Sequence, residues 1–347
     1  MYTSKLQIIW YFYESGKKKE DLKITNELLY SFPNEDMSII KKDWEYIIQK
    51  IKEGKAHELS EADTMYFGAC TKGMNKNTTR EQPFSGIKAK QRAFCFKASY
   101  MTGLVRKHIG CYQNVEKIVK NNISFDAFVN GVVSKYKDKT QTELMQELGI
   151  DSTAKNLFSM IISRMFNVKT KLGNTDEFIK ANIIPKTIRV EKNGKIKESM
   201  PFPHFKFDKV MNTNFDDSDL KEELETTKYM LFIFKKINSE YVFKGIKPWN
   251  MPETMIESKV KDVYEKTQEV IKSGNIVNHI DERGRRISNF PGTKYNGICH
   301  VRPHGRNAKD TTPLPLADKL TGLKDFTKQC FWINNQYLQE IIKDIME

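Results

Sequence analysis

Apolar and polar positions follow the same order in two distant stretches of this chain. Each stretch begins with an apolar run typical of a β-strand and continues with an amphipathic helix that ends at a glycine. A second apolar strand then enters a short loop of small and basic residues, and after a polar gap a third strand passes directly into a helix. Matched order and spacing across four elements indicate a degenerate internal duplication. The matching segments are Lys5–Tyr13 with Lys228–Phe234, Asp43–Leu59 with Val263–Ile280, 66–77 with 296–310, and 92–107 with 328–342.

The first of these helices shows its pattern clearly. Its apolar residues recur at the spacing of one helical face, it is predicted to stop at Gly54, and Asp36 or Ser38 can cap its start. The strand before it, Lys5–Tyr13, is apolar enough to suit the middle of a sheet. The apolar face of the helix consists of Ile39, Ile40, Trp44, Ile47, Ile48 and Ile51.

Between the two copies, the pattern becomes helical from about residue 114. Segments 141–149 and 154–168 form a predicted helix pair, capped by Thr140 or Thr142 and stopped by Gly149. Strand signals return in 178–190 and 197–207, and Asn193-Gly194 between these runs predicts a β-hairpin.

This order places a domain boundary near residues 115–122. Residues 116–347 contain the helix pair, the hairpin, the strands, the amphipathic helix and the basic loop, whereas residues 1–115 contain only the later half of that series. We therefore expect 1–115 to be the later half of a first domain, whose other half would precede Met1, and 116–347 to be a second, complete domain. The first part should then leave an apolar sheet edge or face exposed.

Composition narrows the possible partners. The 347 residues contain no apolar run long enough for a membrane span and no signal-peptide pattern, which predicts a soluble, cytoplasmic protein without a membrane partner. The five cysteines form no CxxC pair, which argues against a zinc ribbon or a disulfide scaffold. The excess of 57 Lys and Arg over 44 Asp and Glu, a net charge of +13, favours a polyanion such as nucleic acid. The alternative is that a Lys-, Ile- and Asn-rich chain is basic through compositional bias alone.

The second loop carries side chains suited to reading DNA bases. Arg302 follows an apolar strand, and Pro303 fixes the next backbone angle. The planar guanidinium is therefore attached to a rigid segment of backbone. Arginine pairs bidentately with guanine, and asparagine such as Asn307 pairs similarly with adenine. Cys299, His300 and His304 could instead be metal ligands, but no fourth ligand at suitable spacing is visible. Four basic residues are better interpreted as phosphate contacts, or as ordinary solvated charges: Lys72, Lys76, Arg306 and Lys309.

These loops and the strands after them resemble the MutH–Sau family, which comprises the MutH mismatch-repair nuclease and tandem-domain type II restriction endonucleases that cut at GATC. The resemblance covers essentially the whole chain and implies restriction-endonuclease-like α/β domains, each with a mixed sheet flanked by helices. Two positions of the first copy depart from the family pattern, with Cys70 in place of the loop arginine and Cys95 in place of the aromatic residue. The residues that the resemblance assigns to DNA binding are Lys72, Asn75, Lys97, Arg302, His304, Asn307, Lys309 and Trp332.

The same resemblance implies where catalysis should reside. Nucleases of the family use a D…ExK motif whose carboxylates hold Mg²⁺. In the second domain Lys186 matches the motif lysine and Asp176 or Glu177 lies upstream, but Ile184 replaces the glutamate and segment 154–168 offers no acid. We therefore expect no catalytic residue, no metal ligand and no productively bound Mg²⁺ in this chain. The strings Asp21-Leu22-Lys23 and Asp219-Leu220-Lys221 also fit the motif, but both lie in highly charged stretches.

Three functions are compatible with these features. The favoured one is the DNA-binding part of a GATC-specific restriction endonuclease, whose second domain binds an effector copy of GATC and assists cleavage elsewhere. Self-association on two DNA sites would fit that role. The alternatives are an active Mg²⁺-dependent endonuclease with an unrecognised acid cluster, and a basic interaction module.

Overall fold

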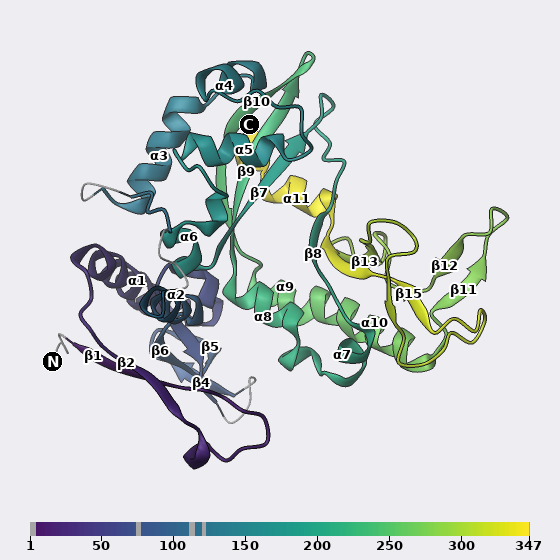
Figure 1. The fold of residues 1–347 in the computed structure, drawn as a ribbon, viewed down its shortest axis with the longest axis horizontal. Coiled ribbons are helices and arrows are strands. Elements are labelled where there is room, and N and C mark those ends of the chain that lie inside the picture. The colour runs from purple at the N-terminus through teal and green to yellow at the C-terminus, as the bar shows by residue number, and fades with distance from the viewer. Residues whose placement is uncertain (1–4, 74–77, 111–114, 120–122, 347) are drawn as a thin grey trace.

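A computed structural model describes residues 5–73, 78–110, 115–119 and 123–346. The chain folds into helices and several small sheets, which confirms the expected α/β class (Figure 1). The largest sheet has β9 (Lys228–Ile237) at its centre, paired antiparallel with β10 (Glu240–Trp249) and parallel with β7 (Ile183–Val190). Tyr229 to Phe234 are all buried, so the centre of this sheet is covered on both faces.

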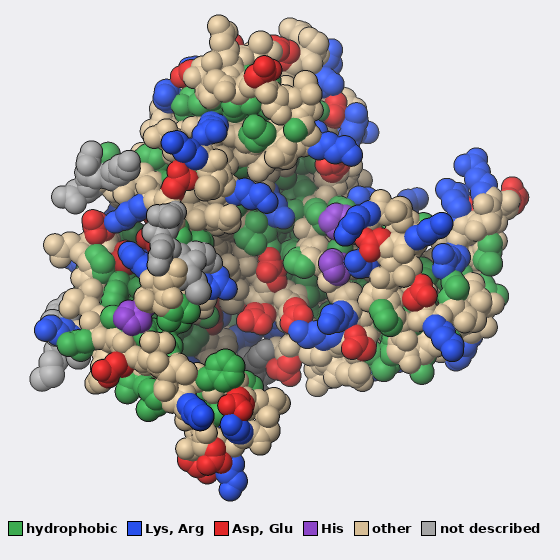
Figure 2. Space-filling model, viewed as in Figure 1, with side chains coloured by type: hydrophobic (Ala, Val, Ile, Leu, Met, Phe, Trp, Pro, Cys, Tyr) green, Lys and Arg blue, Asp and Glu red, His purple; other side chains and the backbone are tan. Residues whose placement is uncertain are grey.

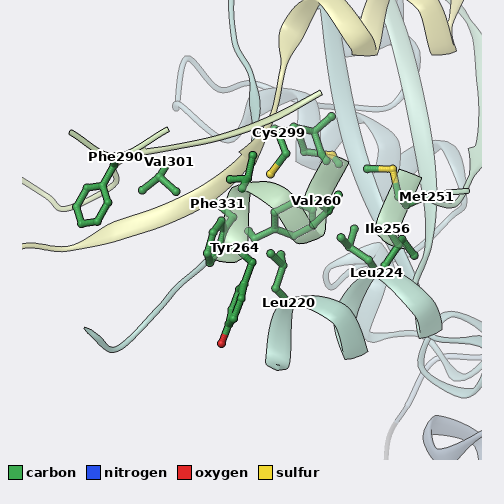
Figure 3. Packing of buried hydrophobic residues seen from close by; sticks show 14 of the residues in the cluster. Leu220, Leu224, Met251, Ile256, Val260, Tyr264, Phe290, Cys299, Val301 and Phe331 are labelled. Carbon is green, nitrogen blue, oxygen red and sulfur yellow. The ribbon is translucent and has the colours of Figure 1, made fainter. Parts of the chain in front are cut away.

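Different helices cover the two faces of this sheet. On one face lie α3 (Phe125–Tyr136), α4 (Gln141–Glu147), α5 (Leu157–Met165) and α6 (Asp176–Ala181), and their apolar residues share a core with alternate residues of β9. The other face packs against the region built on α10 (Lys261–Ser273), whose core is drawn in Figure 3. Further helices of that region are α7 (Phe207–Asn212), α8 (Asp219–Thr226), α9 (Glu253–Met255), a π-helical turn (Ile256–Val260), α11 (Asn335–Ile341) and α12 (Lys343–Met346).

A second three-stranded sheet lies on α10. Its central strand β16 (Gln329–Ile333) pairs antiparallel with β13 (Cys299–Pro303) and with β8 (Met200–His204). Two hairpin-like ribbons flank this sheet: β11 (Val277–Ile280) with β12 (Arg286–Ser288), and β14 (Thr311–Pro313) with β15 (Asp325–Thr327).

The first 110 residues repeat the later part of this order. They contain β1 (Leu6–Tyr11), β2 (Ile24–Tyr30), α1 (Asn34–Lys52), β3 (Phe67–Thr71), β4 (Thr79–Gln82), β5 (Ser85–Lys90), β6 (Arg92–Phe96) and α2 (Ala98–His108). β1 pairs only with β2, and β3 only with β6, among the residues that the structure describes. Their counterparts β9 and β16 each have a third strand, β7 and β8. Of the 19 large apolar side chains that are exposed among the described residues, 13 belong to residues 1–115, so this part has the more open surface.

The two copies match strand for strand in register. Phe67 pairs with Phe96 and Thr71 with Arg92, just as Cys299 pairs with Ile333 and Pro303 with Gln329. Cys70 therefore occupies the place of Arg302, and Cys95 occupies the place of Trp332.

Several local expectations are corrected. The predicted hairpin has its turn, because Glu191 and Lys195 are hydrogen-bonded and Gly194 has a φ of +78°. However, β7 pairs with β9 and β8 pairs with β16, so beyond the turn the two runs belong to different sheets. Residues 178–181, expected to be extended, belong to α6, which ends where Asn182 adopts the left-handed conformation. The expectation of a central strand at Lys5–Tyr13 is wrong, because β1 has only one partner strand and exposes Ile9 and Tyr11.

Helix starts were predicted with mixed success. Thr140 caps α4 as expected, in a capping box with Glu143. Helix α1 instead starts at Asn34 after Pro33, and no side chain caps it. Asp36 turns inward: its Oδ2 accepts from the Tyr100 hydroxyl at 2.9 Å and lies 3.1 Å from Lys180 Nζ. Lys180 also pairs with Asp176 at 2.9 Å, so a buried charge network ties α1 and α2 to α6.

One apolar core is shared between the beginning of the chain and the large sheet. It includes Ile8, Tyr66 and Leu104 together with Phe178 and Phe232. No helix among the described residues is both long and apolar enough to cross a membrane.

Candidate nucleic-acid interface

Arg302 lies on an aromatic platform at the exposed end of β13. Its guanidinium carbon is 4.0 Å from the centre of the Trp332 ring, and the Trp332 indole Nε1 donates a hydrogen bond to the Arg302 carbonyl at 3.2 Å. Trp332 itself is only 6% exposed, whereas Arg302 is exposed. Stacking on an aromatic face limits the rotation of the guanidinium and leaves its N–H groups free to donate. The strand pair β13–β16 thus presents one oriented arginine.

Two histidines complete this platform. His300 is buried, stacks on Trp332 at 6.3 Å between ring centres, and its Nδ1 contacts Asn334 Oδ1. Burial lowers the pKa of His300, so its ring is neutral at pH 7. His304 is exposed, packs edge-on against Trp332 at 4.9 Å, and its Nδ1 lies 3.4 Å from the Cys330 sulfur. Burial raises the pKa of Cys330 to about 12, so a protonated thiol faces the imidazole.

Asp310 organises the loop that follows β13. Its carboxylate accepts a hydrogen bond from the Arg306 backbone N–H at 3.0 Å and pairs with Lys328 Nζ at 2.7 Å, and the Lys328 hydrogen bond is the main reason that the pKa of Asp310 is lowered. The Asn307 side-chain oxygen accepts from the Lys309 N–H at 2.9 Å. The backbone is therefore fixed while the side chains of Arg306, Asn307 and Lys309 remain exposed. Such a loop can hold several DNA-contacting groups in a preset arrangement.

The first copy presents a different surface at the equivalent place. Lys72 is exposed just after β3, and Asn75, like Lys76, lies outside the described residues. Cys70 and Cys95 stand where the second copy has the guanidinium and the indole, and burial together with the neighbouring Cys70 thiol raises the pKa of Cys95 to about 12. Among its described residues, this copy has no arginine stacked on an aromatic ring of the strand pair.

Lys97 faces the interior rather than the loop surface. It is 5% exposed, and its ammonium donates to the carbonyl oxygens of Thr64 at 2.6 Å and Ala181 at 3.3 Å. Burial, with a smaller effect of nearby Lys228, lowers the pKa of Lys97 to about 7. Its place directly before α2 gave no sequence signal of this burial, because the two carbonyl groups come from distant segments.

Strand β7, which the sequence resemblance matches to a catalytic motif, lacks a carboxylate pair. Ile184 and Lys186 are two residues apart on β7 and so point to the same face. Lys186 lines a cavity of about 530 Å³, and burial lowers its pKa. Of the two upstream acids, Asp176 is paired with Lys180, and Glu177 accepts from the backbone N–H groups of Ile118 and Val119. A hydrocarbon side chain at 184 cannot ligate Mg²⁺, so these residues do not fit the ion.

An acid cluster lies elsewhere, between the two copies. Single oxygens of Glu225, Glu253 and Glu257 lie within 4.8 Å of one another. Two lysines occupy the cluster: Lys221 Nζ is 2.6 Å from Glu257, and Lys90 Nζ pairs with both Glu253 and Glu257. These ammonium groups neutralise most of the carboxylate charge, which makes the cluster a set of ion pairs between β5 and the segment around α9. Sequence reasoning missed it because its members are spread from residue 90 to 257.

Neither of the two other motif-like strings belongs to a cluster of three possible metal ligands within the described residues. Asp219 pairs with Lys209 at 2.6 Å, and Lys221 pairs with Glu225 and Glu257 of the cluster described above. Asp21 belongs to a short 3-10 turn with no buried residue.

Comparison with known proteins agrees with these features. No protein-family profile matches the chain. Among curated proteins, the chain is similar to the type II restriction enzyme Sau3AI of Staphylococcus aureus, with 34% identity over 383 residues. The alignment covers 99% of this chain and 78% of that relative.

Proposed function

The chain belongs to the family of type II restriction endonucleases, and from this premise we propose that it binds double-stranded DNA containing GATC through the surface around Arg302. The observation that carries the proposal is the stack of Arg302 on Trp332 beside a rigid, basic loop. An oriented guanidinium suits the O6 and N7 atoms of guanine, and Asn307 in the same loop suits adenine. The DNA is the chain's partner, and Lys309 and Arg306 position it through phosphates.

The proposed role is that of an effector-site protein, which binds a GATC copy and does not itself cut. Type II restriction enzymes generally use Mg²⁺, and Ile184 stands where the family's metal-binding glutamate is expected. Residues 1–115 would be the later half of a first MutH-like domain and 116–347 a complete second one. The shared strand register supports that division, as does the absence of a third strand from either sheet of the first copy in the described ranges. Self-association on DNA carrying two sites follows from such a role.

The direct test compares binding and cutting in one preparation. Fluorescence anisotropy should show tighter binding to a GATC duplex than to a scrambled duplex of equal length, because net charge alone cannot distinguish them. With Mg²⁺ and excess protein, the GATC duplex should remain intact. Equal affinity for both duplexes would reject the proposal.

An active endonuclease is the second candidate, since the Glu225–Glu253–Glu257 group is the one carboxylate cluster of suitable geometry in the described ranges. Metal-dependent cutting by pure protein would favour it. Loss of that cutting in Glu257→Gln, with retained DNA binding, would then assign the reaction to this cluster. Retention of cutting in Glu257→Gln would point to a contaminating nuclease or another site.

A further inference from the structure

The β11–β12 hairpin is a projecting arm on the lobe that carries β13. In Figure 1 it extends from the outer end of that lobe, beyond β15, and Figure 2 shows Lys and Arg side chains along the same margin. Arg283, Arg285 and Arg286 are exposed at or next to its tip. The first copy lacks this arm: between α1 and β3 the described residues form two short 3-10 turns and no strand.

The tip of the arm is preorganised. The Asp281 carboxylate accepts from the backbone N–H groups of Arg283 at 3.1 Å and Arg285 at 2.7 Å, and from Arg285 Nε at 2.7 Å. Gly284 has a φ of +69°, a conformation that glycine adopts readily. Arg285 is thus used to hold Asp281, whereas Arg283 and Arg286 have no carboxylate partner within the described part of the chain. Two cations on the arm are available to an external anion.

The base of the arm is fixed to the same framework as the recognition loop. Asp318 Oδ2, which is buried, accepts from the N–H groups of Ile276 and Val277, both at 2.9 Å. The Arg286 guanidinium lies 5.7 Å from the Phe326 ring on β15, and the next residue, Thr327, donates to the Ala308 carbonyl at 2.9 Å. Arm and loop are therefore held at a fixed separation through β15.

The whole lobe is electropositive. Residues 277–330 contain ten Lys and Arg against five Asp and Glu, a net charge of +5 in 54 residues. Three of the five acids are already engaged, because Asp281 holds Arg285, Asp310 pairs with Lys328, and Asp318 accepts backbone N–H groups. The surplus positive charge is thus carried by exposed side chains. Such a surface suits an extended polyanion that contacts the lobe at several points.

We propose that the β11–β12 hairpin is a second DNA-contact arm, in which Arg283 and Arg286 bind phosphates that flank the sequence read by Arg302. The inference rests on the proposed function, since it takes DNA as the ligand and places Arg302 at the recognition sequence. Arginine binds phosphate oxygens through paired N–H donors, and such contacts are independent of base sequence. The arm extends the footprint without adding specificity.

The test uses the full chain with Arg283→Gln and Arg286→Gln combined, and a control with Lys155→Gln and Lys169→Gln, two exposed lysines outside this lobe. Binding is measured on GATC duplexes of about one and about three helical turns, at several salt concentrations. The arm variant should bind the long duplex roughly tenfold more weakly than wild type, with a salt slope lower by about two, because two phosphate contacts are lost. On the short duplex it should match wild type. The control should match wild type on both.

The outcomes separate the two proposals. If wild type does not distinguish GATC from a scrambled duplex, the proposed function fails, while the length and salt comparison still reports on the arm. If wild type prefers GATC and the arm variant equals wild type on the long duplex with an unchanged slope, the arm proposal fails alone. Hydroxyl-radical footprinting of the wild-type complex gives a second measurement, in which protection confined to the recognition sequence would overturn the arm.

Discussion

At the level of single residues, Arg302 and Lys309 are expected to make different kinds of DNA contact. Arg302→Ala should cost about 1–3 kcal/mol of binding free energy on a GATC duplex and much less on a scrambled one, because it removes a base contact. Lys309→Ala should weaken both duplexes about equally and lower the salt slope by about one, because it removes a phosphate contact. Anisotropy titrations with both duplexes measure both effects. Equal losses on the two duplexes for Arg302→Ala would show that it does not read a base.

The buried ammonium of Lys97 predicts an unusual pH dependence of stability. The folded state releases this proton near pH 7, whereas the unfolded chain holds it to about 10.5. Between these values the unfolded state binds more protons, so the free energy of unfolding rises with pH, and below pH 7 the contribution is constant. In urea unfolding between pH 7 and 9, the free energy of unfolding of wild type should rise by up to about 1.4 kcal/mol per pH unit relative to that of Lys97→Met. Parallel pH profiles for the two proteins would contradict this.

Sequence reasoning identified Arg302 and its loop as an exposed basic feature but not how each side chain is held. Residue type and position after a strand were sufficient to single out Arg302, Asn307 and Lys309. The role of Trp332 as a platform depends on β13 and β16 pairing in one register, and the burial of Lys97 depends on carbonyl groups from Thr64 and Ala181. Both depend on contacts between distant segments, which periodicity does not report.

At the scale of elements, two glycines at equivalent helix ends should respond differently to substitution. Gly54 and Gly274 follow α1 and α10 with φ of +70° and +67°. A Cβ on Gly54 would lie 2.4 Å from the Phe84 carbonyl oxygen, whereas on Gly274 the nearest atom is Lys319 Cε at 3.4 Å. Gly274→Ala should lower the free energy of unfolding by about 1–2 kcal/mol through the left-handed conformation alone. Gly54→Ala should lower it distinctly more, because the added Cβ also clashes. Thermal or urea unfolding measures both losses of stability. Equal losses would contradict the prediction and show that the β4–β5 turn moves away from the added methyl group without a measurable loss.

The elements themselves were well predicted where periodicity or turn chemistry is local. Helices α1, α4 and α10 and strands β9, β13 and β16 lie where the apolar pattern placed them. The hairpin prediction holds only at the turn, where Val190 and Ile196 form a single antiparallel bridge, because Asn193-Gly194 specifies a turn but not the partners of the strands beside it. Those partners, β9 and β16, come later in the chain and offer better-buried faces.

At the scale of the whole molecule, the boundary expected near residue 115 crosses dense packing. Ile8, Tyr66 and Leu104 belong to the same core as Phe178 and Phe232, and the buried Lys180 ammonium joins Asp36 to Asp176. Separating the two sides would expose this core and leave buried charges unpaired. Breaking the charge network alone should lower the free energy of unfolding by about 3–5 kcal/mol.

This shared packing has a consequence for fragment complementation. If residues 1–115 and 116–347 are produced as two polypeptides in one cell, they should assemble and copurify, because the apolar contacts and the Lys180 network do not require a covalent link. Gel filtration in buffer should show one species, and in denaturant two. Lys180→Met in the larger piece should weaken the assembly, whereas Lys155→Gln should not. Two pieces that elute separately in buffer would show that chain continuity, rather than packing, keeps the halves together.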